Sequence, residues 1–306
     1  MDCILQTCEL SKTYENTLAL DNVNIRIEKG GIYGFVGQNG AGKTTFMRIV
    51  SGLSFPNKGD IELFGVSDKK GLAEERKRMG CIIETPAFYP YMTASENMEA
   101  MRITQGIPNK KVVNQALEIV GLSDTGKKKI QNFSMGMKQR LGIATALLGE
   151  PEFLMLDEPT NGLDPVSIVE IRELLIRLVA EKQITILISS HILSELYSLA
   201  TNYIIIHQGR ILQSITKKQL DERCKKHISI HVNDVSHAVT VLERNLFTRN
   251  YKVMPDNSIT LYDFIDDIQR VITAFSEHNL IIKNIMVAGD SLENYFVNTI
   301  GGINHV

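Results

Sequence analysis

A glycine-rich octapeptide, Gly37-Gln38-Asn39-Gly40-Ala41-Gly42-Lys43-Thr44, constrains the fold of this 306-residue chain more than any other feature. It follows a short apolar run, residues 32–36, that predicts a buried strand. It precedes a run whose apolar residues recur at helical spacing. Glycines allow backbone conformations closed to other residues, so successive N–H groups can point at phosphate oxygens at the positive end of that helix. The pattern therefore predicts a strand–loop–helix unit that binds the phosphates of a nucleotide.

Each polar position of this loop has a chemical reason. Lys43 supplies a compact positive charge for the β- and γ-phosphates, and the Thr44 hydroxyl is a ligand for Mg²⁺. A chance glycine-rich turn is the alternative interpretation, but such a turn needs neither the preceding strand nor the following helix. We therefore predict that the nucleotide-binding residues include Gly37, Gln38, Asn39, Gly40, Ala41, Gly42, Lys43, Thr44 and Thr45.

An acidic pair follows a second predicted buried strand, residues 153–156, which ends in Asp157-Glu158. We expect Asp157 to hold Mg²⁺ through a water molecule. We expect Glu158 to polarise the attacking water as a general base. A solvated acidic pair at a strand end is the plainer alternative, and it would be preferred if the chain had no phosphate-binding loop.

Strands and helices alternate along the first two thirds of the chain, which predicts an α/β fold with a mostly parallel sheet covered on both faces. Residues 21–28 alternate polar and apolar, which predicts one half-exposed strand. Residues 93–149 have an almost wholly helical pattern, which predicts a helical subdomain inserted on the sheet. The other buried strands and the helix that we predict here are 80–83, 184–188, 203–206 and 165–181.

The pattern changes after the predicted turn at 208–210. A strand, a helix, two strands, a helix and a strand follow in that order, and a last helix ends the series. This βαββαβ order suggests a small α+β domain of the split βαβ kind. The ranges are 228–232, 238–246, 251–254, 259–262, 265–278, 281–287 and 292–300. We therefore expect one domain over 1–215 and a carboxy-terminal accessory domain over 223–306.

Composition excludes several classes of function. A formal net charge of −2 offers no electrostatic footprint for nucleic acid. Four cysteines without paired spacing fit free thiols in a reducing cytosol better than a zinc site or a disulfide framework. The amino terminus lacks the pattern of a secretory signal, and no apolar run approaches the roughly 18 residues of a spanning helix. We therefore expect any work at a membrane to depend on another chain.

Several motifs carry a resemblance to a known family. Residues 133–140 resemble the signature motif of ATP-binding-cassette (ABC) ATPases, although they depart from Leu-Ser-Gly-Gly-Gln and keep only the serine, Ser134, and the second glycine, Gly136. Residues 156–164 resemble the acidic strand of the cassette and its D-loop. Ser190-His191 resembles the switch histidine, and Tyr14 is placed like the adenine-stacking aromatic. The resemblance covers about residues 1–215, with every motif in the expected order. It implies the fold of the ABC ATPase core, in which a mostly parallel sheet is joined by an antiparallel β portion and a helical subdomain.

The resemblance implies a dimeric mechanism for ATP hydrolysis. Two copies of the chain close head to tail around two ATP molecules with Mg²⁺. Ser134 and the backbone of Gly136 then contact the γ-phosphate held by the other copy, where the positive end of a helix suits that charge. Asp164 lies at the dimer seam, His191 reaches the γ-phosphate, and Tyr14 stacks on the adenine.

Glu84 departs from the pattern of most cassettes, in which a glutamine at this place touches Mg²⁺ and faces the membrane subunit. A glutamate here resembles the cassettes that serve lantibiotic immunity and bacitracin-type peptide resistance. Its carboxylate adds a full negative charge near the metal and the γ-phosphate, which strengthens metal binding but repels the nucleotide. We expect Glu84 both to ligate the metal and to transmit closure to the permease.

The function that these resemblances imply is the ATP-hydrolysing subunit of a membrane exporter for an antimicrobial peptide or a related amphipathic substrate. It would act at the cytoplasmic face of the membrane, bound to one or more permease subunits. The apolar segment 88–92 is either packed in the core or forms a groove for a permease helix. The carboxy-terminal domain resembles the accessory domain of drug- and peptide-exporting cassettes, for which we expect a structural or dimer-stabilising role.

A soluble cassette ATPase of translation or DNA maintenance is the alternative function. Translation-type proteins generally carry two cassettes in one chain, and repair-type proteins carry long coiled-coil or zinc insertions. This sequence has one cassette and neither kind of insertion. The transporter interpretation is therefore preferred.

Overall fold

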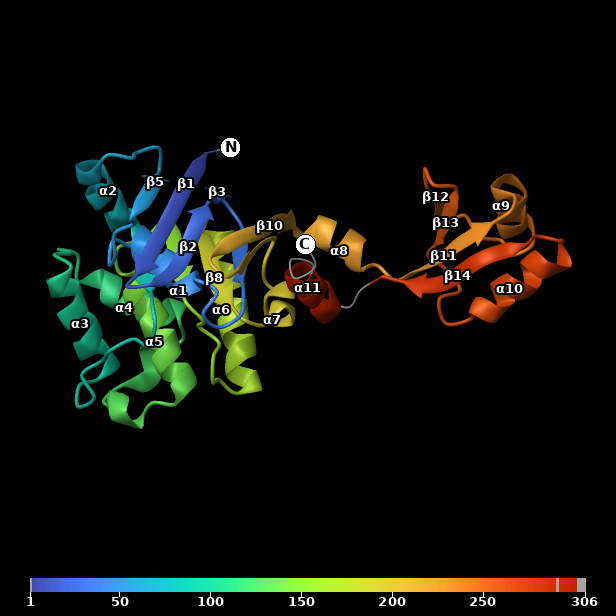
Figure 1. Cartoon of the computed structure of the whole chain (residues 1–306). Helices are drawn as coiled ribbons and strands as arrows, with labels where there is room; N and C mark the ends of the chain where they lie inside the picture. The colour runs from blue at the N-terminus through green and yellow to red at the C-terminus, as the bar shows by residue number, and fades with distance from the viewer. Residues whose placement is uncertain (1, 290–291, 302–306) are drawn as a thin grey trace. The chain divides into compact units, whose positions relative to one another are not determined.

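The computed structural model describes residues 2–289 and 292–301, and it divides into two compact units, Met1–Lys217 and Lys218–Val306 (Figure 1). The parts of the predicted accessory domain at 290–291 and 302–306 lie outside the described residues. The first unit contains the phosphate-binding loop and residues 156–164, which resemble the acidic strand and the D-loop.

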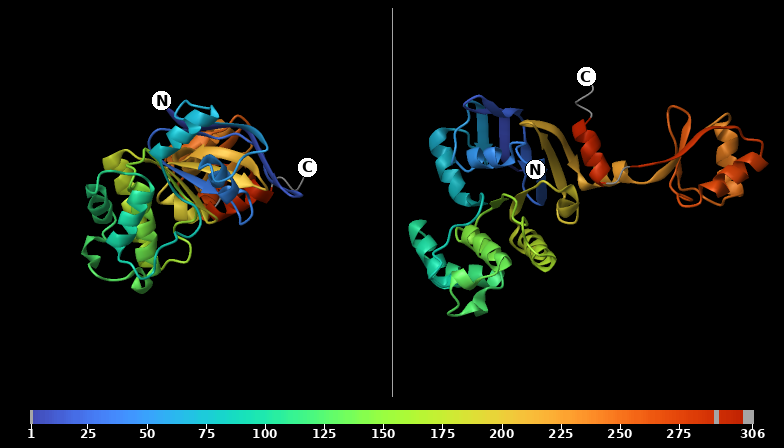
Figure 2. Two further views of the ribbon diagram at one scale, coloured as in Figure 1. Left: turned by 90° about the vertical axis from the view of Figure 1, so that its left-hand side faces the viewer. Right: turned by 60° about the horizontal axis from the view of Figure 1, so that its bottom comes forward.

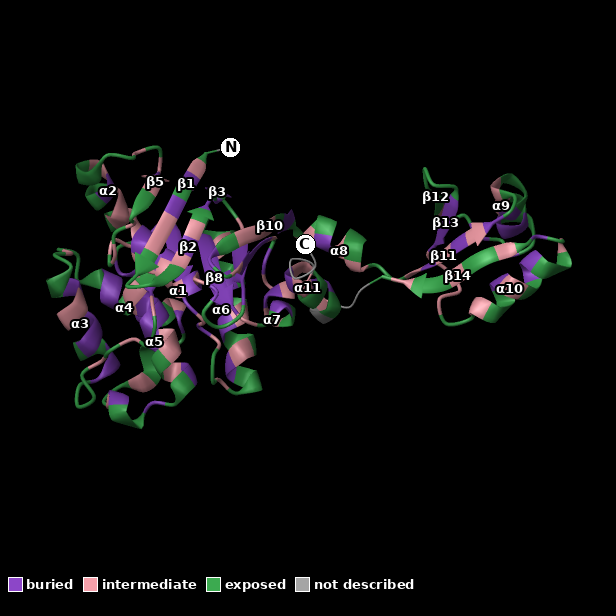
Figure 3. Ribbon diagram, viewed as in Figure 1, coloured by how far each residue is buried: buried purple, intermediate pink, exposed green. Residues whose placement is uncertain are grey.

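A six-stranded sheet forms the centre of the first unit, in the order β10-β9-β4-β8-β7-β6. Neighbours from β9 to β6 are parallel, and β10 pairs antiparallel with β9. Figure 3 shows the middle strands buried, because both faces of the sheet are covered. The bounds are β4 Ile32–Val36, β6 Met79–Ile82, β7 Phe153–Leu156, β8 Thr185–Ser190, β9 Asn202–His207 and β10 Arg210–Thr216. The prediction of a mostly parallel α/β sheet is confirmed.

A second, antiparallel sheet is built around β1 (Cys3–Tyr14), which pairs with β2 (Thr17–Val23), β3 (Arg26–Glu28) and β5 (Lys58–Leu63). The prediction of one continuous strand over residues 21–28 is wrong, because the chain breaks between β2 and β3.

The side chain of Thr7 occupies this break. Its Oγ1 donates to the carbonyl of Val23 at 3.0 Å and accepts the N–H of Ile25 at 3.0 Å. Asn22 has a left-handed φ of 54°, a conformation that a regular strand does not use. The alternating pattern therefore spans two short strands joined by a side-chain bridge.

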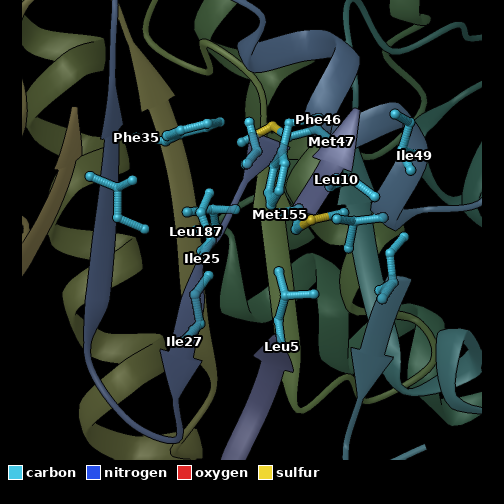
Figure 4. Packing of buried hydrophobic residues seen from close by; sticks show 14 of the residues in the cluster. Leu5, Leu10, Ile25, Ile27, Phe35, Phe46, Met47, Ile49, Met155 and Leu187 are labelled. Carbon is cyan, nitrogen blue, oxygen red and sulfur yellow. The ribbon is translucent and has the colours of Figure 1, made fainter. Parts of the chain in front are cut away.

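The hydrophobic core of the first unit joins both sheets to α1 (Lys43–Val50), the helix that follows the phosphate-binding loop (Figure 4). Phe46 and Met47 of α1 are fully buried. The ring of Phe46 meets Phe35 of β4 edge to face, with centroids 5.2 Å apart. This packing fixes the amino-terminal end of α1, where Lys43 and Thr44 lie.

The helical subdomain consists of α3 (Ala94–Thr104), α4 (Lys111–Ile119) and α5 (Met135–Leu147), which pack on one another on one side of the unit (Figures 1 and 2). A capping box begins α3: the Thr93 N–H donates to Glu96 Oε2 at 2.6 Å, and the Glu96 N–H donates to Thr93 Oγ1 at 3.2 Å. The other helices of the unit are α2 (Lys69–Glu75), α6 (Pro165–Lys182) and α7 (Leu193–Tyr197).

The second unit contains a four-stranded antiparallel sheet in the order β12-β13-β11-β14, with α9 and α10 packed on its apolar face. This arrangement is the predicted split βαβ order. Asp234 caps α9, which therefore begins at Val235, before the predicted residue 238. Asp267 caps α10, which therefore begins at Ile268, after the predicted residue 265. The bounds are α8 Lys217–Cys224, β11 His227–Val232, α9 Val235–Arg244, β12 Tyr251–Val253, β13 Ser258–Leu261, α10 Ile268–Glu277, β14 Ile282–Ala288 and α11 Leu292–Gly301.

Candidate functional site

Three polar segments meet where the parallel strands of the central sheet end. β4 leads into the phosphate-binding loop, β7 into Asp157-Glu158, and β8 into Ser190-His191. β8 pairs with both β4 and β7, so the carboxyl ends of these strands are adjacent. Ligand sites of open α/β sheets form at such an edge.

The phosphate-binding loop needs glycine at two positions for different reasons. Gly42 has a φ of 108°, and a Cβ there would lie 2.6 Å from the carbonyl oxygen of Ala19. Gly37 has an ordinary backbone, but a Cβ there would lie 2.6 Å from the carbonyl oxygen of Ile206. The loop is thus pressed against β2 and β9, which holds its backbone in place.

Lys43 carries a buried positive charge at the base of the loop, with 5% of its side chain exposed. Its Nζ donates to the carbonyls of Gly37 at 2.6 Å and Gln38 at 3.3 Å, and it lies 3.2 Å from Glu158 Oε1. A pocket of about 380 Å³ opens beside it. The polar residues that line this pocket include Asn39, Lys43, Thr44, Thr45, Glu158 and Gln208.

Thr44 and Asp157 form one hydrogen-bonded network with Ser189, although they are far apart in the sequence. Thr44 Oγ1 donates to Asp157 Oδ2 at 2.6 Å, and Ser189 Oγ donates to Asp157 Oδ1 at 2.6 Å. Ser189 Oγ also accepts the N–H of Glu158 at 2.8 Å. The hydroxyl and carboxylate oxygens fit Mg²⁺, which binds proteins through one or two such groups plus phosphate oxygens. Sequence reasoning missed Ser189, because only the pairing of β8 with β7 brings its hydroxyl to Asp157.

Glu158 is held between two basic groups. Its Oε1 faces Lys43, and its Oε2 lies 3.0 Å from Nδ1 of His191. The structure therefore brings together the predicted general base, the predicted switch histidine and the phosphate-binding lysine. Two opposite contacts fix the direction of the carboxylate, as a group that must orient a water molecule requires.

Glu84, which follows β6, forms an ion pair with Arg48. Arg48 lies one turn after Thr44 on α1, and the side chains of Arg48 and Glu84 are 41% and 61% exposed. The Glu84 carboxylate contacts this guanidinium, whereas Asp157 contacts Thr44. Sequence reasoning missed Arg48, whose place on the same face of α1 as Thr44 was the available signal.

Tyr14 lies at the turn of the β1–β2 hairpin and is 41% exposed. Its hydroxyl is 3.3 Å from Ser54 Oγ, and Lys12 Nζ lies 4.9 Å from its ring centroid. Thr17 and Leu18 of the same hairpin line the 380 Å³ pocket. The structure therefore places Tyr14 on the element that borders this pocket.

Ser134, Gly136 and Asp164 meet where α5 and α6 begin. Ser134 caps α5 by accepting the N–H of Met137 at 3.2 Å. Asp164 caps α6 by accepting the N–H of Ser167 at 2.9 Å and its hydroxyl at 2.8 Å. These two donors hold the pKa of Asp164 below its ordinary value, with the backbone N–H as the larger cause. Among the described residues, the lining of the 380 Å³ pocket includes none of these three.

Comparison with known proteins identifies the family. The sequence profile described as "ABC transporter" matches residues 20–161. The bacitracin transport ATP-binding protein BcrA of Bacillus licheniformis is 43% identical over 302 residues, which are 99% of each chain. This chain belongs to the ABC transporter family. The family, the α/β cassette fold and the ATPase activity predicted from the sequence are thereby confirmed.

One further relative and one solved structure agree with the assignment of this chain to the ABC transporter family. The lantibiotic transport ATP-binding protein SrtF of Streptococcus pyogenes is 41% identical over 209 residues, 68% of this chain and 89% of its own. The solved dimer of the ABC cassette MJ0796, in a post-hydrolysis state bound to ADP and Pi, matches with a TM-score of 0.63 at 25% identity. That match covers 70% of this chain and 99% of the other.

The described part of this ABC protein has no helix that is both long and apolar enough to span a membrane.

Proposed function

We propose that this ABC protein hydrolyses ATP to drive export of an antimicrobial peptide of the bacitracin or lantibiotic kind. The observation that carries the proposal is the likeness to the bacitracin transport ATP-binding protein, which extends over 99% of both chains and so includes the second unit. The shorter likeness to a lantibiotic transport ATP-binding protein supports the same substrate class.

The residues of this chain divide the chemistry among them. The phosphate-binding loop and Lys43 bind the β- and γ-phosphates, because the loop supplies backbone N–H donors and the lysine supplies charge. Thr44 and Asp157 hold Mg²⁺, which would neutralise phosphate charge when bound. Glu158 orients the attacking water and accepts its proton, and His191 fixes the Glu158 carboxylate and reaches the γ-phosphate.

A second copy of the chain completes the site. Ser134 and the Gly136 backbone contact the γ-phosphate of the other copy, and Asp164 lies at the seam. Met135 and Val166 support this role, because these apolar side chains beside the two helix starts are 56% and 68% exposed. Tyr14 stacks on the adenine at the edge of the pocket.

A permease helix binds in a groove of about 700 Å³ between β6 and the helical subdomain. The lining of this groove includes Phe88 from the segment after Glu84, and Met101 and Gly142 from α3 and α5. Tyr89 and Tyr91 follow and are 60% and 76% exposed, which suits an apolar partner. Binding there would hold the chain at the cytoplasmic face of the membrane. Glu84, at the entry to this segment, transmits closure.

Peptide protection tests the proposal. The parent chain and Glu158→Gln are expressed with the membrane protein that copurifies with the parent, and the cells are challenged with bacitracin and with a lantibiotic. We expect the parent to protect against one of them and Glu158→Gln to abolish protection. Equal protection by both forms would refute the transport role, and copurification with ribosomes instead of a membrane protein would favour the soluble alternative.

The role of Glu84 is tested by Glu84→Gln in the same cells. We expect both peptide protection and the ATPase rate to change, because the substitution removes one negative charge beside the phosphates. If both quantities match the parent, the glutamate has no special role.

A further inference from the structure

Glu195 joins two loops of the ATPase site that the mechanism above treats separately. It lies on α7, the short helix that follows His191. Its Oε2 accepts hydrogen bonds from Thr160 Oγ1 at 3.2 Å and from Ser190 Oγ at 3.2 Å. Thr160 belongs to the 159–163 loop, which leads from Glu158 to Asp164, and Ser190 directly precedes His191.

The contacts of Glu195 are those of an acceptor rather than of an ion-pair partner. Within the described ranges, no Lys, Arg or His forms an ion pair with this carboxylate. Ser190 is 3% exposed, and its Oγ also accepts the N–H of Ile192 at 3.0 Å. Hydrogen bonds to a carboxylate are about twice as strong as those between neutral groups. Glu195 therefore fixes both hydroxyls in place.

The two loops that Glu195 joins also carry the hydrolytic pair. Glu158 immediately precedes the 159–163 loop, and its Oε2 lies 3.0 Å from His191 Nδ1. A cavity of about 180 Å³ lies between the loops, and Glu158, Thr160, His191 and Glu195 all line it. Any displacement of one loop relative to the other would change the Glu158–His191 spacing.

We propose that Glu195 is a positioning residue that clasps the 159–163 loop to the segment carrying His191. The clasp maintains the distance between Glu158 and His191. A movement that begins at Asp164 therefore reaches His191 through Thr160 and Glu195. It acts on ATP hydrolysis itself, whatever substrate is transported, and so goes beyond the proposed function.

The test is steady-state ATP hydrolysis by the purified full-length chain. Glu195→Ala removes the shared acceptor but leaves the phosphate-binding loop intact. We expect kcat to fall about tenfold while KM for ATP stays within about twofold. Glu195→Gln keeps an acceptor oxygen, and we expect kcat within about threefold of the parent. Ser198→Ala is the matched control, because the Ser198 hydroxyl donates to the main-chain carbonyl of Glu195, at 3.4 Å, and its loss should leave both constants unchanged.

A double-mutant cycle separates the clasp from a general loss of stability. If Thr160 acts through Glu195, then Thr160→Val should lower kcat in the parent and change it little in the Glu195→Ala background. Independent, multiplying effects of the two substitutions would overturn the proposal. So would a parental kcat in Glu195→Ala, or a Glu195→Gln variant as impaired as Glu195→Ala. If Glu195→Ala does not fold, Glu195→Gln and Thr160→Val still decide the matter. A failure of peptide protection would refute the export role but would leave these ATPase results unaffected.

Discussion

Gly136→Ala is expected to destabilise the cassette, because α5 and α6 begin in close contact. A Cβ on Gly136 would lie 2.4 Å from Ser167 Oγ and 2.9 Å from Ser167 Cβ. Rotation of the Ser167 hydroxyl relieves the first contact but not the second, and it breaks the bond from that hydroxyl to Asp164. One of the two helix starts must therefore move.

The size of the effect follows from two opposed contributions. Overpacking a well-packed contact costs about 1–3 kcal/mol. Alanine is favoured over glycine inside a helix by up to about 1 kcal/mol, which offsets part of that cost. We expect a net loss of roughly 1–2 kcal/mol of unfolding free energy, or a melting temperature lower by about 2–8 °C for a unit of this size.

Thermal unfolding followed by circular dichroism measures this loss, with Gly149→Ala as the matched control. A Cβ on Gly149 meets nothing closer than the carbonyl oxygen of Lys77 at 3.7 Å, so this control should unfold near the parental temperature. In a Ser167→Gly background, which lacks both contacting atoms, Gly136→Ala should cost much less. If Gly136→Ala unfolds like Gly149→Ala, or costs as much in the Ser167→Gly background, the reasoning from this contact fails.

Three further predictions concern charges in and around the site. Glu158→Gln should lower kcat by about 10²-fold or more while a fluorescent ATP analogue still binds, and a parental kcat would exclude Glu158 as the base. Arg48→Ala should lower the Mg²⁺ concentration for half-maximal ATPase in the parent but not in Glu84→Gln, and equal shifts in both backgrounds would show that the pair is irrelevant to the metal. NMR titration should give Asp164 a pKa below its ordinary value, and Ser167→Ala should raise that pKa by removing one hydrogen-bond donor. The stability that this lowered pKa contributes is fully present above the unfolded-state pKa of Asp164. It is lost as the pH falls through the lower, folded-state pKa.

Sequence reasoning succeeded where a motif carries its own local geometry. The phosphate-binding loop, the acidic pair and the switch histidine each follow a buried strand, as predicted, and the loop gave the acidic pair its interpretation as part of a nucleotide site. β1 was missed as a strand for the opposite reason. Its register shifts at several points and its burial does not alternate, so the period-two signal of a half-buried strand is absent.

Residues whose partners are far away in the sequence could not be predicted either. Ser189 bonds to Asp157 across 32 positions and Glu195 to Thr160 across 35. Serine and glutamate are common residues at strand ends and in the first turn of helices, so neither carries a pattern of its own. Only the pairing of β8 with β7 brings these groups to the acidic pair.

The Arg48–Glu84 pair changes how the glutamate after β6 is understood. Considered alone, Glu84 adds a negative charge that strengthens metal binding and opposes the phosphates. With Arg48 one turn after Thr44, that charge has a counterion on the very helix that begins at the phosphate-binding loop. Ion pairs between solvent-accessible side chains contribute only about 0–1 kcal/mol, and Arg48 and Glu84 are 41% and 61% exposed, so the carboxylate can exchange Arg48 for another positive centre at little cost. A strong, buried pair would hold residue 84 in place, whereas a weak pair fits the proposed role of Glu84, which requires this residue to respond to the charge at the phosphate site.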